Sequence, residues 1–315
     1  MRGLTRLTLA LSLVGLLAGC SRSVPQEANA APPERLRDPD LDECSGFARS
    51  SVHEGVLWSH NDSGGEPILY AVGLRGERRG RVRVEGATNV DWEDITFDRH
   101  GNLWIHDGGN NRNARKDLTL YRVPEPSALD GTVKADRVVR FHFPEQTEFP
   151  PTSAERNFDS EAIFWDGGEL FLLTKHRGNT KTTLYRFPQG FEDEPRWSAA
   201  EPEGSLALER ISEYELGGDP NNYGGKVTAA DLSPDGNTLA VLTYHALFLF
   251  PRTETNWLAG TPRVIRLAQL LTQQCEAIAW VGEQGLMFSN EGRALFYLDE
   301  PMNPRCQVFP GPGCD

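Results

Sequence analysis

Residues 159–187 read DSEAIFWDGGELFLLTKHRGNTKTTLYRF, and this stretch decides the fold. An acidic and apolar start (Asp159 to Ile163) precedes a second apolar run that ends in polar residues (Leu170 to Lys175). A third run contains an aromatic residue (Thr183 to Phe187), and a fourth follows at Ser205 to Glu215. Short apolar runs separated by Gly, Asp and Asn are typical of β-strands joined by turns. The stretch therefore predicts one four-stranded antiparallel sheet.

The same four-part order recurs along the whole chain. Its acidic and apolar starts lie at Glu43 to Phe47, Asp91 to Ile95, Asp159 to Ile163, Thr228 to Leu232 and Gln274 to Ile278. A four-stranded unit repeated in tandem is typical of a β-propeller, in which each repeat is one blade. We predict an all-β propeller with five four-stranded blades. A six-bladed propeller is possible if one repeat has diverged beyond recognition. A β-sandwich or β-barrel is the alternative fold.

Composition agrees with an all-β protein and argues against a nucleic-acid-binding protein. The 315 residues include 31 glycines and 21 prolines, which interrupt helices and suit short strands. The chain carries 45 acidic and 32 basic residues, a formal charge of −13. Because affinity for phosphate backbones comes from Lys and Arg, we expect no nucleic acid among the partners.

The N-terminus predicts an exported lipoprotein. A basic start is followed by a short apolar run and by Leu17-Ala18-Gly19-Cys20, which matches a bacterial lipobox. We predict a signal peptide at 1–19, lipid attachment at Cys20, a flexible Pro-rich tether at 20–40 and a single propeller domain at 41–315. An ordinary signal peptide with a chance cysteine is the alternative. The residue after Cys20 is Ser21 and not the Asp that retains lipoproteins in the inner membrane. We therefore expect the outer membrane, at its periplasmic face, rather than the inner membrane.

The remaining cysteines form an even set in an oxidising compartment, where disulfides are expected. Cys44 and Cys275 occupy the same register in the first and last repeats, whose first strands are neighbours in a closed ring. We predict that a Cys44–Cys275 disulfide closes the ring and that a Cys306–Cys314 disulfide fastens the C-terminal tail.

Polar residues at the starts of the first strands and at the ends of the second strands predict an acidic site, or mouth, at one end of the propeller axis. The first strands of a propeller line its axis, and each begins beside the end of the antiparallel second strand. The residues that we expect to bind there are Glu93, Asp94, Asp107, Asn110, Asn111, Arg115, Glu161, Lys175, Glu276 and Glu291. Glu93, Glu161 and Glu276 share a register, and their oxygens suit a hard cation such as Ca²⁺. Hydrogen bonding to backbone N–H groups, or pairing with Lys175 and Arg112, would explain the same glutamates without a metal.

Two loops and two histidines complete the candidates. Residues 107–115 read DGGNNRNAR, with glycines that allow close approach of the backbone and arginines that could hold an anion. Residues 61–65 form a similar loop around Asp62. His106 and His176 lie at or just after the ends of second strands and are the candidates for a catalytic base, although we favour the alternative that they are buried, hydrogen-bonded histidines. The chain has neither a Gly-x-Ser-x-Gly nor a His-Glu-x-x-His motif.

Several of these motifs resemble those of secreted bacterial propeller proteins without assigned activity. They are Asn61 to Gly64, Asp91 to Ile95, Asp107 to Asn111 with Arg115, Asp159 to Ile163, and Gln274 to Ile278. The group is distantly similar to phytase-like and lactonase-like propellers, and this resemblance implies Ca²⁺ in the axial channel. Ser45 and Ala230 replace the acid in the first and fourth repeats, so the metal ring would be incomplete.

Together these features predict a lipid-anchored propeller of the cell envelope. We expect its acidic mouth to bind a small polar or cationic ligand or an envelope protein, with Ca²⁺ as a compatible ion. The alternative is a metal-dependent esterase, phosphodiesterase or lactonase. A scaffold without a ligand is the third interpretation.

Overall fold

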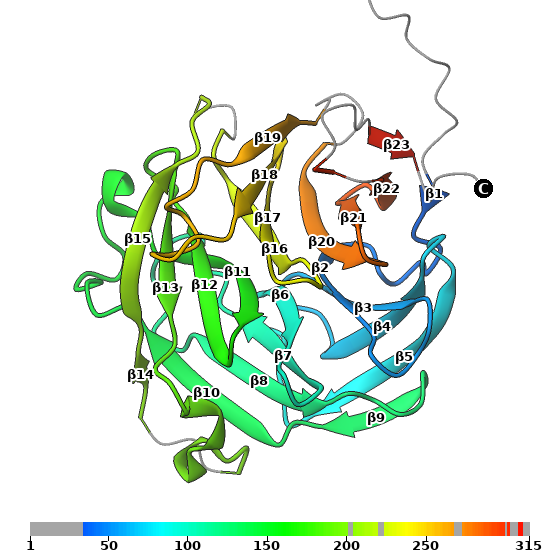
Figure 1. Ribbon diagram of the computed structural model, residues 1–315. Coiled ribbons are helices and arrows are strands. Elements are labelled where there is room, and N and C mark those ends of the chain that lie inside the picture. Colours follow the sequence, from blue (N-terminus) through cyan, green and yellow to red (C-terminus); the bar gives the residue numbers. More distant parts are fainter. Residues whose placement is uncertain are drawn as a thin grey trace, which may run out of the picture. The chain divides into compact units, whose positions relative to one another are not determined.

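The computed structural model describes residues 34–200, 204–219, 224–267, 273–299 and 301–302, together with the backbone of 308–310. Within these residues the chain forms five sheets around a common axis, in which the consecutive strands of each blade pair antiparallel (Figure 1). The first strand of each sheet contacts the first strands of both neighbouring sheets, which closes the ring. The predicted five-bladed propeller is therefore confirmed.

The blades follow the chain in order. Blade 1 comprises β2 (Cys44–Arg49), β3 (Val56–Asn61), β4 (Ile68–Gly73) and β5 (Arg78–Glu85). Blade 2 comprises β6 (Trp92–Phe97), β7 (Asn102–Asp107), β8 (Thr119–Pro124) and β10 (Arg137–His142). Blade 3 comprises β11 (Asp159–Asp166), β12 (Glu169–Lys175), β13 (Lys181–Arg186) and β15 (Glu209–Glu215). Blade 4 comprises β16 (Val227–Leu232), β17 (Thr238–Thr243), β18 (Ala246–Pro251) and β19 (Arg263–Arg266). Blade 5 comprises β20 (Cys275–Val281), β21 (Gly285–Asn290) and β22 (Ala294–Leu298), with β1 (Glu34–Arg35) and β23 (Val308–Pro310) outside β22.

Helical structure in the described residues is limited to short turns in the insertions of blade 3 and before it. These 3-10 helices are η1 (Ser153–Glu155), η2 (Phe191–Asp193) and η3 (Pro195–Trp197). The described residues contain no helix long and apolar enough to cross a membrane.

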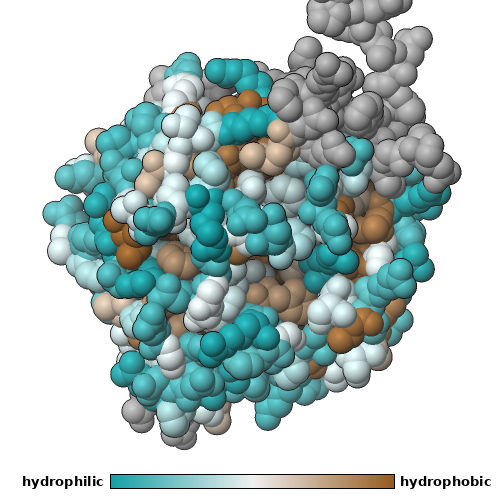
Figure 2. Space-filling view, viewed as in Figure 1, coloured by the Kyte–Doolittle hydropathy of each residue, from teal (hydrophilic) through white to brown (hydrophobic). Residues whose placement is uncertain are grey.

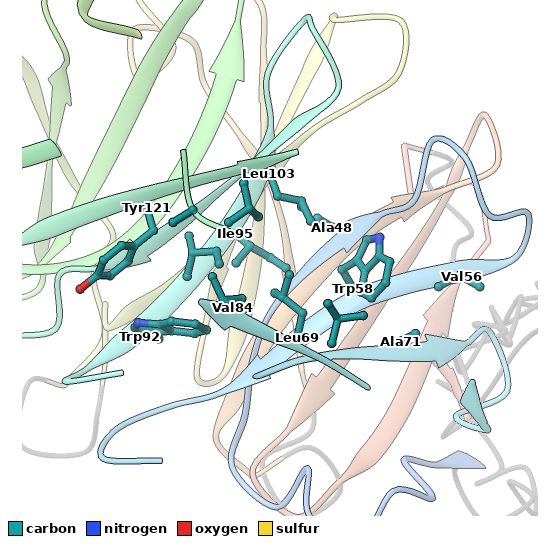
Figure 3. Packing of buried hydrophobic residues seen from close by; sticks show 14 of the residues in the cluster. Ala48, Val56, Trp58, Leu69, Ala71, Val84, Trp92, Ile95, Leu103 and Tyr121 are labelled. Atoms are coloured by element: carbon teal, nitrogen blue, oxygen red, sulfur yellow. The ribbon is translucent and has the colours of Figure 1, made fainter. Parts of the chain in front are cut away.

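Hydrophobic cores lie between neighbouring blades. Because strand side chains alternate between the two faces of a sheet, each inner strand contributes to the core on either side. Between blades 1 and 2, Trp58 and Leu69 point toward Ile95 and Leu103 (Figure 3). Each of the other four blade interfaces has an equivalent cluster. The outer surface in Figure 2 is mostly hydrophilic, with hydrophobic residues in small scattered patches.

Extra strands cover the outer edges of two blades. Strand β9 (Gly131–Lys134), from the connection between β8 and β10, pairs in parallel with β5 of blade 1. Strand β14 (Leu206–Ala207), from the insertion before β15, pairs in parallel with β10 of blade 2. Exposed strand edges invite pairing with other chains, so each blade here protects the edge of the one before it.

The ring is closed by the N-terminal segment. Strand β1 pairs antiparallel with β22, so residues before blade 1 complete blade 5. The Asp38 carboxylate, 2% exposed, accepts hydrogen bonds from the guanidinium of Arg81 in β5 and forms an ion pair with Arg78. The predicted tether at 20–40 is thus too long at its C-terminal end, because residues 34–40 belong to the propeller. The sequence contains no apolar repeat at this two-residue strand that would have revealed it.

The predicted disulfide between Cys44 and Cys275 is wrong: no bond joins the two sulfur atoms. Cys44 lies in the core between blades 5 and 1, whereas Cys275 lies in the core between blades 4 and 5. Equivalent positions of neighbouring blades face the same way around a ring, so they cannot face each other. The Cys44 Sγ atom lies 3.2 Å from Ser59 Oγ and accepts a hydrogen bond from Ser289. Burial raises its pKa to about 11. Cys20 and the predicted Cys306–Cys314 pair lie outside the described residues.

Candidate functional site at the axial mouth

A β-bulge near the start of every first strand shapes the axial site. The pairing of first and second strands shifts register at the same place in all five blades. The residues that the shifts enclose are Gly46, Glu93, Glu161, Thr228 and Glu276. A bulge leaves one residue out of the ladder and re-aims its side chain. It therefore brings glutamates from blades 2, 3 and 5 to the axis instead of into the hydrophobic cores.

The acids that gather here form a site that we call the acidic mouth. It consists of Asp62, Asp91, Glu93, Asp159, Glu161 and Glu276, with Lys175 and Arg177 among them. Glu93 and Glu161 are each at least 95% buried, being 5% and 0% exposed. Burial raises the pKa of both carboxyl groups well above the usual value, and their mutual repulsion adds to the shift at Glu93.

One part of the mouth, the unpaired half, consists of Asp62, Asp91 and Glu93. One carboxylate oxygen of each lies within 4.8 Å of those of the other two. Among the described residues, no side chain or backbone group donates a hydrogen bond to these carboxylates, and no cationic group pairs with them. Burial, reinforced by the neighbouring acids, raises the pKa of Asp62 to about 7 and that of Asp91 to about 6. This half holds more negative charge than its protein surroundings compensate.

The other part, the paired half, consists of Asp159, Glu161, Lys175 and Arg177. The Lys175 Nζ atom lies 2.7 Å from Glu161 Oε1 and 5.0 Å from the ring centroid of Tyr244. The Arg177 Nε atom donates to Asp159 Oδ2 at 2.6 Å. Burial alone would lower the pKa of Lys175, but the attraction of Glu161 raises it well above its usual value. The ammonium is therefore charged at neutral pH and compensates the acids of blade 3.

The Asp107-Gly108-Gly109 segment forms the wall of the mouth. A Cβ atom at Gly109 would overlap Glu93 Oε1 and the Asp91 carboxylate, so any other residue there would displace these side chains. The Arg115 guanidinium contacts Asp107 Oδ1 at 3.0 Å and donates to the Gly109 carbonyl oxygen at 2.9 Å. Asp107 in turn accepts the backbone N–H of Asp91 at 3.0 Å. The close approach expected of these glycines is thus made to the protein's own acids, and Arg115 supports the wall.

Asp94 follows Glu93 in the sequence, but its carboxylate lies outside the acidic mouth and is bound by backbone N–H groups. Its Oδ2 atom accepts the backbone N–H of Ile163 in blade 3 at 3.0 Å and that of Ala230 in blade 4 at 3.3 Å. Its Oδ1 atom accepts the N–H of Ile95 at 2.9 Å. The binding role that the sequence suggested for Asp94 is therefore replaced by a structural one, in which a buried carboxylate links three blades.

The other predicted residues lie at the rim or within the blades. Asn110 donates its backbone N–H to Asp159 Oδ1 at 2.6 Å, and Asn111 accepts a hydrogen bond from Arg177. Glu291 is exposed and accepts a hydrogen bond from Gln274. Asp231, which the repeat placed at a strand start, lies further along the axis and accepts the backbone N–H of Trp280 at 2.7 Å. The repeat alignment was two residues out in blade 4, where Thr228 rather than Ala230 occupies the bulge, and one residue out in blade 1, where Gly46 rather than Ser45 does.

Neither predicted base reaches the mouth as a free side chain. His106 is 0% exposed, and its Nε2 atom forms a hydrogen bond with Ser160 Oγ at 2.7 Å. Burial lowers the pKa of His106 to about 3. His176 contacts Asn179 and Thr183 through its two ring nitrogens, and burial lowers its pKa to about 4. These environments fit buried structural histidines.

Sequence reasoning missed Arg177 and the positions of Asp91 and Asp159. Arg177 follows the Lys175-His176 end of β12, and a search for cations beside each acidic start would have found it. Asp91 precedes the bulge of β6 by two residues, and only the bulge brings its carboxylate beside that of Glu93.

Comparisons with known proteins identify no family for this chain. No protein-family model and no curated protein matches the chain significantly. Among solved structures, the aldose sugar dehydrogenase of Streptomyces coelicolor is 11% identical with a TM-score of 0.45, covering 90% of this chain and 94% of its own. A putative 6-phosphogluconolactonase from Bacteroides fragilis is 13% identical with a TM-score of 0.40, covering 84% and 69%. The propeller domain of Cps50 from Myceliophteria thermophila is 12% identical with a TM-score of 0.40, covering 85% and 73%.

Proposed function

We propose that this chain is a binding protein whose acidic mouth takes a small cationic ligand or a hard cation. The observation that carries the proposal is the Glu93 carboxylate, which is 5% exposed, surrounded by other acids and without a partner among the described residues. Burying an ionised carboxylate without compensation is costly, so such a group either binds a proton or is paired with a cation. Lys175 and Arg177 form ion pairs only with the paired half, although the charge of Lys175 also lowers the pKa values of Asp62, Asp91 and Glu93 against the effect of burial.

Binding is favoured over the hydrolase alternative by the surroundings of the histidines. General base catalysis needs a group within hydrogen-bonding reach of the substrate, with a pKa near the working pH. His106 is buried between blades, both ring nitrogens of His176 are engaged, and both have lowered pKa values. We therefore assign no catalytic residue.

We also propose that the propeller is held at a membrane by lipid on Cys20, with the mouth available to a small molecule or an envelope protein. The support is the lipobox and the polar segment after it. Metabolic labelling with a fatty acid tests this: wild type should incorporate label, Cys20→Ala should not, and a label retained by Cys20→Ala would contradict it.

The binding proposal is tested by thermal unfolding of the full chain after chelation. Addition of Ca²⁺, Mg²⁺ or an organic polyamine should raise the melting temperature, since a ligand that binds only the folded state stabilises it. Sodium chloride at equal ionic strength is the control for screening. If no divalent or organic cation raises the melting temperature or binds, the proposal fails. Release of product from ester or lactone substrates, lost on chelation, would instead support the hydrolase.

A further inference from the structure

We infer that the mouth binds one hard divalent cation of the Ca²⁺ class away from the axis, between blades 1 and 2, on Asp62, Asp91 and Glu93. This inference rests on the proposed function and deepens it by naming the ion and its ligands. It also differs from the ligand set expected from the repeat, because Glu161 and Glu276 are left out.

The geometry of the three carboxylates fits a single ion. Asp62 follows β3, Asp91 precedes β6, and Glu93 occupies the bulge within β6, so two adjacent blades supply the ligands. Their ligand atoms lie within 4.8 Å of one another. Oxygens at about 2.3 to 2.6 Å from one Ca²⁺ lie at most about 5 Å apart. One ion can therefore reach all three without movement of the backbone.

Burial supplies an independent reason for a ligand. Glu93 is more than nine-tenths buried, and no cationic side chain of the described residues forms an ion pair with its carboxylate. The Asp62 Oδ1 atom is buried and lacks a hydrogen-bond partner there, as does the Glu161 Oε2 atom across the mouth. Buried polar atoms in native proteins nearly always have partners, so these oxygens indicate a bound group.

The wall of the mouth leaves room for the ion's ligands. At Gly109 the carboxylates of Glu93 and Asp91 both lie in the space that a Cβ atom would fill. The glycine backbone, fixed through its carbonyl oxygen by Arg115, lets the two carboxylates approach each other. Any side chain at this position would push them apart.

Resident cations exclude the ion from the axis. The Lys175 ammonium lies at Glu161, and its charge also lowers the pKa of Glu276 against the effect of burial. Arg177 pairs with Asp159 and lies 3.4 Å from Glu161 Oε1. A divalent ion between Glu161 and Glu276 would be repelled by both side chains. The charge of Lys175 also reaches Asp62, Asp91 and Glu93, but in the part of the chain that the structure describes no cationic group forms an ion pair with them.

The donor set selects the class of ion. All three ligands are carboxylates, which suit Ca²⁺ or Mg²⁺ rather than the softer metals that prefer His or Cys. Asp62 and Asp91 are partly exposed, so water can supply the remaining ligands. Ca²⁺ accepts six to eight oxygens in irregular geometry, and this favours it over Mg²⁺ at a site with three protein ligands.

Calorimetric titration of the chelated full chain with Ca²⁺ tests the assignment. Wild type should bind one ion per chain. Asp62→Asn and Asp91→Asn should each weaken binding at least tenfold and more than Glu276→Gln does, while Glu169→Gln, the loss of a carboxylate that pairs with Arg186 outside the mouth, should change affinity less than threefold. Unfolding curves of the variants show that each is folded, and Gly109→Ala provides a second test that leaves every carboxylate in place.

The outcomes separate this inference from the proposed function. If Glu276→Gln and Glu161→Gln abolish binding while Asp62→Asn and Asp91→Asn do not, the ion lies on the axis; the inference is overturned and the proposed function stands. If wild type binds none of Ca²⁺, Mg²⁺ and organic cations, the inference and the proposed function both fail. If wild type binds an organic cation but neither divalent ion, only the inference fails.

Discussion

The two halves of the acidic mouth lie side by side and treat buried carboxylates differently. In the paired half, Lys175 and Arg177 supply positive charge from the same blade as Asp159 and Glu161. In the unpaired half, Asp62, Asp91 and Glu93 come from two blades and have no cation among the described residues. The comparison indicates a division of roles: a resident cation makes one half part of the fold, and the other half is left for an exchangeable one.

The largest expected effect comes from removing the resident cation. Lys175→Met should destabilise the cation-free protein by about 3 kcal/mol, because it removes the nearest cation from the buried Glu161 carboxylate and leaves only Arg177, at 3.4 Å, to compensate it. Urea unfolding measures the change. Lys181→Met, which breaks an exposed pair with Glu213, is the control and should have no measurable effect. An equal loss of stability in both variants would show that the buried Lys175–Glu161 pair stabilises the protein no more than an exposed ion pair does.

A smaller loss of stability is expected on substitution of Asp94. This variant tests whether Asp94 has a structural role and its neighbour Glu93 a binding role. Asp94→Ala should cost roughly 2 kcal/mol, since three backbone N–H groups lose their acceptor. Its calcium affinity should remain within threefold of wild type. Urea unfolding and calcium titration of one preparation give both values. A variant of normal stability that no longer binds calcium would reverse the roles assigned to Asp94 and Glu93.

The wall of the unpaired half is tested by one added methyl group. Gly109→Ala should weaken Ca²⁺ binding about tenfold, roughly 1.4 kcal/mol, because the Cβ atom would separate the Glu93 and Asp91 carboxylates. Gly65→Ala is the matched control, since a Cβ atom there meets nothing closer than Asn89 Nδ2 at 4.0 Å. Equal affinities for the two variants would exclude the wall from the site.

The smallest effect concerns pH. The raised pKa values of Asp91 (about 6), Asp62 (about 7) and Glu276 (about 8) mean that the folded protein holds protons which the unfolded chain has already released. Stability without calcium should therefore fall as pH rises from 5 to 8. Calcium competes with the protons on Asp62 and Asp91, so the melting-temperature gain it gives should grow from near zero at pH 5 to about 5 °C at pH 8. Thermal scans measure it, and a gain independent of pH would count against the site.

The sequence predicted the ring because every blade repeats one order of strands, and the repeat also marked Glu93, Glu161 and Glu276. It did not predict which acids are compensated. That depends on the bulges, which shift the side chains by one position, and on Arg177, which follows the strand end outside the repeated motif. Nor could a shared register decide the cysteines, because equivalent positions of a rotationally arranged ring face the same direction. The two residues of β1 are too short to show a pattern.

The position of a bound ion is the most direct test of the division between the two halves. A crystal of the full chain grown with Ca²⁺, or with Mn²⁺ as an anomalous scatterer, should show one peak within about 2.6 Å of oxygens from Asp62, Asp91 and Glu93, with Lys175 still on Glu161. A peak on the axis between Glu161 and Glu276, with Lys175 displaced, would contradict the account.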